Sequence, residues 1–415
     1  MEDQFTTFQN PTPVPFAVAA QPIRPAAGPL TAARIEPPAD SSVPGAYGGE
    51  SRNSRLSQRL GSASSAPLAV RWRADLTPTL RPFVLLASGN RVVLHGATQW
   101  ALCDRAGRVL DVAPLGPSPV ALDPARSLAF AADPFGRIVA HSLADGQAVF
   151  SALLYFGKSF THPFLALRDR LMVTVGIEIP VDPSMPSPER SIVEVTDLGD
   201  PASRRSWDEP GGPAVIHDLI RDSRRMLAAL AGDTLVLAVP NRVYLLDLSL
   251  KARRAMGGVF LPLALSLDEA GRIYLLVAAG GRSALWLLTP EGERIYECEL
   301  PPGLRGLIHP PIVGYDHTVF VRAERQILSI APDGKVNWIR TADEPLAGAA
   351  ITPDDFLLTS EGSSLAAWDA KGERRVLHTF AGENPTTAPV LTADGEILVA
   401  TRTHLYCLAP RGGPR

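Results

Sequence analysis

TADGEILVATRTHLYCLAPRG, from Thr392 to Gly412, holds the pattern that decides the fold. An Asp-Gly turn is followed by an apolar run, a short polar break, a second run of aliphatic and aromatic residues, and another glycine turn. The same order recurs in TPDDFLLTSEGSSLAAWDAKGERRV (Thr352–Val376) and in GYDHTVFVRAERQILSIAPDGKVNW (Gly314–Trp338). Short strands that repeat at a period near 40 residues indicate a β-propeller, in which each repeat is one four-stranded blade.

Eight copies of this pattern lie between Leu86 and Pro410, and the third strand of each copy is the clearest marker. We expect these strands to begin near Gln99, Arg137, Ser191, Arg242, Ala284, Gln326, Ser364 and His404. Six copies place a glycine at one position of the following turn, namely Gly107, Gly146, Gly292, Gly334, Gly372 and Gly412. Glycine tolerates the positive φ that such turns require. Copies three and four lack it and are the least regular. The fold is therefore predicted to be all-β and eight-bladed, with a seven-bladed ring as the alternative if these two copies merge.

The ends of the repeat region predict how the ring closes. The eighth copy stops at Pro410–Arg415, before a fourth strand can form, whereas AVRWRAD (Ala69–Asp75) precedes the first copy. AVRWRAD resembles KVNWIRTAD (Lys335–Asp343), the fourth strand of copy six. A ring has an unpaired edge at its seam unless one blade borrows a strand from the other end of the chain. We expect Ala69–Asp75 to complete the last blade, with Trp72 and Trp338 at matching places between blades.

Residues 1–66 have a different composition from the rest of the chain. They are rich in Pro, Ala and Ser and lack strand periodicity. Such a segment cannot bury enough apolar surface to offset the entropy of ordering. We predict a disordered arm over residues 1–66 and a propeller over residues 67–415. Within the arm, Ser51–Ser65 is either a solvated linker or a docking or phosphorylation segment.

The repeat resembles that of the PQQ-type, or quinoprotein-like, propeller family over residues 68–410, most closely in the last copies. Eight blades are usual in that family, whose members include quinone-dependent alcohol dehydrogenases, outer-membrane assembly lipoproteins and cofactor-free scaffolds. The dehydrogenases carry an adjacent Cys–Cys pair, but Cys103, Cys298 and Cys407 are far apart, and no calcium-binding Asn and acidic set maps onto this chain. The lipoproteins need a lipidated cysteine near the start. The resemblance therefore implies the fold without a cofactor.

Composition narrows the classes of partner. The net charge of −3 and the pI near 6.3 argue against nucleic-acid binding. No stretch approaches the roughly 18 consecutive apolar residues of a membrane helix. The start, MEDQFTTFQN, lacks the basic residues of an export signal, so we expect a cytoplasmic location and no membrane insertion. The three cysteines have no metal-ligand spacing, the eight histidines form no close pair, and we expect the tryptophans to serve mainly in packing.

Two insertions mark copies three and four. Ile177–Arg190 lies between the second and third strands of copy three, and Asp208–Arg225 joins copy three to copy four. Both should project from the same face, and VIHDLIRDSRR (Val215–Arg225) has the apolar spacing of a short amphipathic helix. On a repeat scaffold, function concentrates in inserted loops. The candidate partner-docking residues are Ile177, Pro180, Met185, Ile216, His217, Leu219, Ile220 and Arg221.

These observations favour a non-enzymatic interaction scaffold, a subunit of a larger assembly that docks protein partners through these loops and the N-terminal arm. The alternative is an enzyme or small-ligand-binding propeller with its site at the axial mouth of the ring. No G-x-S-x-G elbow, Walker A loop or dinucleotide fingerprint supports the alternative. Tolerated insertions without a docking role would also produce the same irregular spacing.

Overall fold

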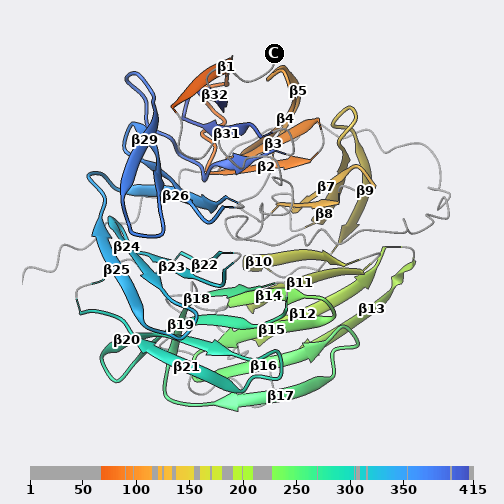
Figure 1. Ribbon diagram of the computed structural model, residues 1–415. Coiled ribbons are helices and arrows are strands. Elements are labelled where there is room, and N and C mark those ends of the chain that lie inside the picture. The colour runs from red at the N-terminus through yellow and green to blue at the C-terminus, as the bar shows by residue number, and fades with distance from the viewer. Residues whose placement is uncertain are drawn as a thin grey trace, which may run out of the picture. The chain divides into compact units, whose positions relative to one another are not determined.

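The chain folds into eight four-stranded antiparallel sheets, which form the eight blades of a β-propeller (Figure 1). The structure, a computed structural model, describes residues 67–410 except for 89, 97, 115–119, 124–125, 133–136, 154–158, 169–170, 180–189, 199, 209–226, 269, 303, 305–308, 315, 353 and 393–394. In the part that it describes, no helix has the length and apolar composition needed to cross a membrane. The eight-bladed prediction is confirmed, and the seven-bladed alternative is wrong.

The strands follow the chain in order within seven blades, and the eighth blade takes its fourth strand from the N-terminal side. Blade 1 is β2 (Val84–Ser88), β3 (Arg91–His95), β4 (Gln99–Asp104) and β5 (Val109–Pro114), and blade 2 is β6 (Val120–Asp123), β7 (Leu128–Ala132), β8 (Arg137–Ser142) and β9 (Ala148–Leu153). Blade 3 is β10 (Ser159–Arg168), β11 (Leu171–Ile179), β12 (Arg190–Asp197) and β13 (Asp200–Asp208), and blade 4 is β14 (Leu227–Ala231), β15 (Thr234–Val239), β16 (Arg242–Asp247) and β17 (Ala252–Gly257). Blade 5 is β18 (Leu261–Leu267), β19 (Ile273–Ala279), β20 (Arg282–Leu288) and β21 (Arg294–Glu299), and blade 6 is β22 (Ile312–Val313), β23 (Val319–Arg322), β24 (Gln326–Ile330) and β25 (Val336–Thr341). Blade 7 is β26 (Leu346–Ile351), β27 (Leu357–Glu361), β28 (Ser364–Trp368) and β29 (Arg374–Thr379), and blade 8 is β30 (Val390–Leu391), β31 (Ile397–Ala400), β32 (His404–Pro410) and β1 (Leu68–Asp75).

The third strands begin where the repeat predicts. Six of the eight start at the expected residue, β12 starts one residue early at Arg190, and β20 starts two residues early at Arg282. Second and third strands are richest in apolar residues because neighbouring blades cover both of their faces. All five residues of β27 are buried, for example, whereas five of the six residues of β17 at the rim are exposed.

The apolar core lies between blades. Leu237 of β15 packs with Val195 of β12, and Val236, the residue before Leu237, packs with Leu275 of β19. Alternate residues of one strand thus serve two different interfaces, one on each side of the sheet. Fully burying a leucine or valine contributes about 1.5–3 kcal/mol, so each blade depends on both of its neighbours for most of its stability.

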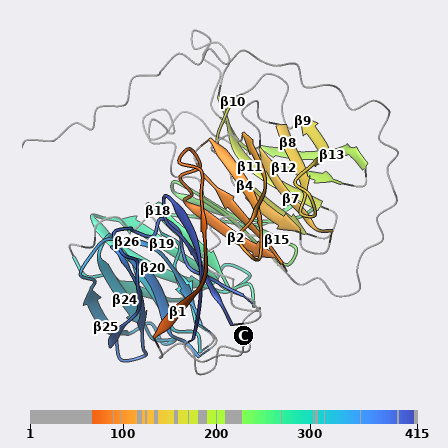
Figure 2. The ribbon, with the colours of Figure 1, turned by 90° about the horizontal axis from the view of Figure 1, so that it is seen from above.

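Strand β1 closes the ring. It pairs antiparallel with β32, from Leu68 opposite Pro410 to Asp75 opposite His404. Figures 1 and 2 show β1, at the red end of the colour scale, beside the blue strands of the C-terminal end. The predicted closure by Ala69–Asp75 is confirmed, and the strand begins one residue earlier than expected.

Trp72 and Trp338 take matching places in their fourth strands. In β25, Ser329 pairs with Trp338 and Ile330 with Val336, so one residue bulges out just before the tryptophan. The register of β1 shifts in the same way between Val70 and Trp72. Each indole then covers a glycine in the turn of the next blade, because a Cβ on Gly107 or Gly372 would lie within 2.8 Å of the ring. The bulge aims the tryptophan across the interface.

The turn glycines explain why one residue type recurs. Gly107, Gly146, Gly292, Gly334 and Gly372 have φ between +75° and +86°, as predicted, and Gly412 lies outside the described residues. Blade 4 makes the same turn with Leu250, at φ +64°. The amide of Leu250 donates to the carbonyl of Asp247, just as that of Gly372 donates to Asp369. Leu250 is buried among apolar residues of blades 3 and 4, which offsets a left-handed conformation that costs about 1–2 kcal/mol.

Replacing Gly372 by alanine should destabilise the protein more than replacing Gly382. Both glycines have almost the same φ, +75° and +73°, so the conformational cost of about 1 kcal/mol is shared. A Cβ on Gly372 would lie 2.8 Å from Trp338, whereas none of the neighbours of Gly382 lies within 4 Å of its Cβ. The clash should add about 1–3 kcal/mol for Gly372→Ala. Urea unfolding of the two variants measures the difference, and equal losses would contradict the packing role of the indole.

Candidate functional site at the ring seam

Alternating strand directions give the propeller two faces. The connection face carries the loops between second and third strands and the segments that join one blade to the next. The turn face carries the loops between first and second and between third and fourth strands. Both predicted insertions belong to the connection face, since residues 180–189 lie between β11 and β12 and residues 209–226 between β13 and β14.

The structure corrects the start of the first insertion. Ile177, expected in a loop, is a residue of β11, where it pairs with Ser191 of β12 and with Thr161 of β10. The insertion begins by lengthening a hairpin because Ile177, Glu178 and Ile179 alternate as a strand requires. The other candidate docking residues, Pro180, Met185, Ile216, His217, Leu219, Ile220 and Arg221, lie outside the described residues, as does the helix expected over Val215–Arg225.

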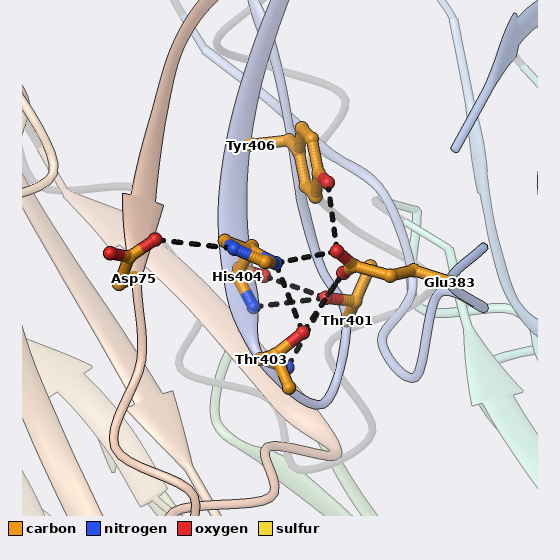
Figure 3. Close-up of polar contacts among 6 residues, drawn as sticks. All are labelled: Asp75, Glu383, Thr401, Thr403, His404 and Tyr406. Carbon is orange, nitrogen blue, oxygen red and sulfur yellow. Dashed lines mark hydrogen bonds and ion pairs between the residues drawn. The ribbon is translucent and has the colours of Figure 1, made fainter. Parts of the chain in front are cut away.

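A polar cluster occupies the connection face where the ring closes (Figure 3). Asp75 ends β1, His404 begins β32, and Glu383 comes from the segment that joins blade 7 to blade 8. Nδ1 of His404 lies 2.6 Å from Oε1 of Glu383, and its Nε2 lies 3.2 Å from Oδ1 of Asp75. The imidazole thus bridges two carboxylates, one from each side of the seam.

The bridge is complete when His404 is protonated. A neutral imidazole has one N–H donor, whereas the imidazolium has two and can donate to both carboxylates. His404 and Glu383 are largely buried, while Asp75 is 88% exposed in its side chain. The Glu383 contact is therefore shielded from water and the Asp75 contact is not, so the inner pair holds the geometry.

Glu383 accepts hydrogen bonds from almost every side around it. Thr401 and Thr403 donate their hydroxyls to Oε2, and Tyr406 donates its hydroxyl to Oε1 at 3.3 Å. Burial raises the pKa of Glu383, but the hydrogen bonds from the two threonines and His404 outweigh burial and bring the pKa below its ordinary value. Burial, and then the Glu383 charge, raise the pKa of Tyr406. This carboxylate is held ionised as an acceptor.

A second ionic cluster holds the seam on the turn face. Glu396, whose side chain is 5% exposed, pairs with Arg71 of β1 and, at 3.0 Å, with Arg105 of blade 1. Arg71 is the residue at the bulge of β1. The distortion that positions Trp72 therefore also takes Arg71 out of the regular pairing with β32, and its guanidinium contacts Glu396. Charged groups tie β1 at its middle, through Arg71, and at its C-terminal end, through Asp75.

Reactive groups in the described residues are few. Burial raises the pKa of the Cys103 and Cys407 thiols to about 12, and all three cysteines are buried and free. Neither thiol is therefore a nucleophile at neutral pH. Among the described residues, no group of three or more His, Cys, Asp or Glu side chains is arranged to hold a metal ion.

A hollow opens on the turn face between blades 6 and 7. Its volume is about 450 Å³, and Phe320 and Trp338 form part of its wall. Two carboxylates enter it from turns of different blades. A Cβ placed on Gly314 would lie 2.9 Å from Oδ1 of Asp316 and 2.7 Å from Oδ1 of Asp355. Arg340 and Lys371 also line the hollow, so both signs of charge would meet a small ligand there.

The sequence does not predict the two polar clusters at the seam, although it does predict that Asp75 and His404 lie opposite each other. The predicted closure already places Asp75 opposite His404, because β1 ends where β32 begins. Glu383 and Glu396 gave no such signal. They come from loops of blade 8 whose paths do not follow from the strand pattern.

Comparison with known proteins supports the fold and nothing finer. No family model matches the chain, and no curated protein sequence matches it. Solved structures do. BamB from Moraxella catarrhalis shares 12% identity at a TM-score of 0.57, covering 84% of this chain and all of that one. Quinohemoprotein alcohol dehydrogenase from Comamonas testosteroni shares 12% sequence identity at a TM-score of 0.58. The match covers 87% of this chain and 79% of that one. Sqt1 from Saccharomyces cerevisiae shares 10% sequence identity at a TM-score of 0.57. The match covers 84% of this chain and 99% of that one. These similarities show the β-propeller fold.

Glu383→Gln should destabilise the protein at pH 7 by about 1–3 kcal/mol, since hydrogen bonds to a charged group are worth about that much. The pKa of Glu383 is lower in the folded state than in the unfolded chain. The stabilisation is therefore complete above about pH 4.3, the ordinary value for glutamate, and is lost as the pH falls through the folded pKa.

Unfolding free energies measured between pH 7 and pH 3 (about the range of carboxylate titration) test this. The acid-induced loss of stability should be smaller in Glu383→Gln than in the parent protein. Glu291→Gln, at an exposed glutamate in the turn after β20, is the control and should follow the parent. Parallel curves for all three proteins would contradict the role of Glu383.

Proposed function

We propose that this protein is a non-enzymatic interaction scaffold, a subunit of a larger assembly, whose loop insertions in blades 3 and 4 dock protein partners. The observation that carries the proposal is the position of residues 180–189 and 209–226. Other blades join their second and third strands through loops as short as residues 362–363, and they join to the next blade through segments as short as 342–345. Strands β12 and β13 separate the two long segments in the chain, and the strand ends that flank both segments lie on the same face.

The rest of the described ring is consistent with a structural role, which leaves partner docking to the inserted segments. Its large side chains pack between blades, and its polar cluster at His404 ties the seam together, so these groups serve closure. The thiols have pKa values raised by burial, which leaves them unsuited to nucleophilic chemistry. We infer that the protein works without a quinone cofactor, since the sequence has no adjacent cysteines. The N-terminal arm, residues 1–66, would thread into a partner and gain order on binding.

The structural neighbours are consistent with such a role only in general terms. The propeller fold of BamB and Sqt1 is shared with a dehydrogenase, so fold does not decide between scaffold and enzyme. The inserted segments favour the scaffold, because the closure of the ring by β1 and β32 does not involve them.

Shortening the first insertion tests the proposal. Residues 181–188 would be replaced by Asn-Gly, which forms a tight hairpin turn and keeps β11 and β12 paired. A second variant would keep the length of the segment and scramble its order, which separates the role of its sequence from that of its length. We expect the tagged wild-type protein to recover its partners from cells of the source organism, and both variants to lose at least one of them.

Mass spectrometry of the native complexes reads partners and bound small molecules together, and circular dichroism checks that each variant is folded. Full recovery of every partner by the shortened variant, by a second variant lacking 210–225 and by a third lacking 1–66 would refute the docking role. A stoichiometric small molecule on the purified protein would favour the enzyme or ligand-binding alternative.

A further inference from the structure

The hollow between blades 6 and 7 lies where blade 6 departs from its neighbours at one residue. In blades 5, 7 and 8, the turn between the first and second strands begins with a side chain that accepts a hydrogen bond from the backbone amide four residues later. The acceptors are Asp268 for the amide of Arg272, Thr352 for that of Phe356, and Thr392 for that of Glu396. Gly314 occupies this position in blade 6, since its amide donates to the carbonyl of Thr318 just as that of Thr352 donates to Phe356.

The backbone does not require a glycine at this position. The φ of Gly314 lies outside the left-handed region, so an alanine could adopt the same conformation, unlike at Gly372. The glycine leaves space instead. A Cβ there would lie 2.7 Å from Oδ1 of Asp355 and 2.9 Å from Oδ1 of Asp316. Two carboxylates from adjacent blades therefore converge over a residue that has no side chain.

Asp355 is a second departure from the repeat, in the next blade. It occupies the fourth position of its turn, where blades 5 and 8 have Gly271 and Gly395, and all three residues have positive φ. Glycine would meet the needs of this turn. His317 occupies the same position in blade 6 and contacts Arg272 of blade 5 at 2.7 Å, so a side chain here reaches toward the preceding blade. Asp355 in this way adds a carboxylate to the wall of the hollow.

The hollow also carries two cations. Arg340 of β25 donates to the backbone carbonyls of Gly372 and Lys371 at 3.1 and 3.2 Å, and its guanidinium carbon lies 5.8 Å from the centre of the Trp338 ring. These neutral acceptors hold the guanidinium in place without neutralising its charge. Within the described ranges, no carboxylate pairs with Arg340 or with Lys371.

The two signs of charge come from different parts of the blades. The carboxylates of Asp316 and Asp355 belong to turns between first and second strands, which are the inner strands of a blade. Arg340 belongs to a fourth strand and Lys371 to a turn between third and fourth strands, which are the outer strands. A ligand with one kind of charge would meet like charge on part of the wall, whereas a ligand with both kinds can match each part.

We propose that this hollow binds a small zwitterion of the amino-acid type, with its ammonium group on Asp316 and Asp355 and its carboxylate on Arg340 and Lys371. Hydrogen bonds between charged donors and acceptors are the strong ones in such a site. The volume of about 450 Å³ falls within the range of about 300–1,000 Å³ that is usual for small-molecule sites.

This inference goes beyond the scaffold role and does not depend on it. The hollow lies on the turn face, whereas the inserted segments emerge on the connection face, so a ligand in the hollow would not compete with a docked partner. Arg340 and Lys371 are exposed, and water weakens the contacts that they make. We therefore expect a dissociation constant of about 0.1–1 mM.

Isothermal titration calorimetry of the full-length protein with the dipeptide glycyl-leucine tests the proposal at low ionic strength. Two further probes keep the skeleton and remove one charge each. N-acetyl-glycyl-leucine lacks the ammonium group, and glycyl-leucinamide lacks the carboxylate. We expect the dipeptide to bind at one site and each of the other two probes to bind at least about tenfold more weakly.

Two variants address the carboxylate side of the hollow. Gly314→Ala should fill the space between the carboxylates and weaken dipeptide binding at least about tenfold. Gly257→Ala is the matched control, because Gly257 also has φ outside the left-handed region and none of its neighbours lies within 4 Å of its Cβ. Asp355→Gly supplies the residue that blades 5 and 8 use in this turn, so it should fold. Urea unfolding checks the stability of each variant.

Pairing the variants with the probes locates each charge. Asp355→Gly should reduce the difference in affinity between the dipeptide and its N-acetyl form, and Lys371→Gln should reduce the difference between the dipeptide and its amide. Lys335→Gln, at an exposed lysine of blade 6 that does not line the hollow, should change neither difference.

Three results would overturn the proposal. They are no binding of the dipeptide, equal binding of all three probes, and unchanged affinity for the dipeptide in both Gly314→Ala and Asp355→Gly. The recovery of protein partners through the inserted segments is a separate measurement, so none of these results would bear on the docking role.

Discussion

The antiparallel pairing of β1 with β32 is the interaction on which the remaining contacts of the ring depend. Each blade buries its faces against two neighbours, so an open ring would expose one apolar face of blade 8 and one of blade 1. Leu68 of β1 packs into the cluster of blades 7 and 8, and Trp72 packs against the cluster of blades 8 and 1. One short strand thus completes two interfaces. The ion pairs of Arg71 and Asp75 hold it at its middle and at its C-terminal end.

The same kind of contact recurs at several interfaces between blades, although a different side chain makes it in different blades. A turn glycine lies under a large group from the preceding blade, which is an indole at Gly107 and Gly372, the phenol ring of Tyr296 at Gly334, and the thioether of Met256 at Gly292. The positive φ of the turn and the absence of a Cβ serve two needs at once. The backbone can reverse direction, and the neighbouring blade can approach closely. Repetition of this contact around the ring explains why a local sequence pattern specifies a fold of this size.

Sequence patterns predicted those features of the fold that depend on residues close together in the chain. Strand starts, turn glycines and the closing strand could be read from apolar runs and turn residues, because each depends on residues close in sequence or on a copy of the same pattern. The seam clusters could not, since Glu396 and Arg105 meet across most of the chain and no periodicity encodes the contact. The spacing of the third strands predicts a loop at Ile177, whereas Ile177 belongs to β11 and alternates with Glu178 as a strand requires. Leu250 was a departure from the glycine pattern, yet burial lets a leucine adopt the same turn.

The order of β1 in the chain has a consequence for biosynthesis. A ribosome makes β1 before any other strand of the propeller and makes its partner β32 after all the others. During translation the blades can stack one after another, but β1 has no sheet to join until the chain has reached Pro410. The nascent protein is therefore an open arc for most of its synthesis, and closing the ring is its last folding step.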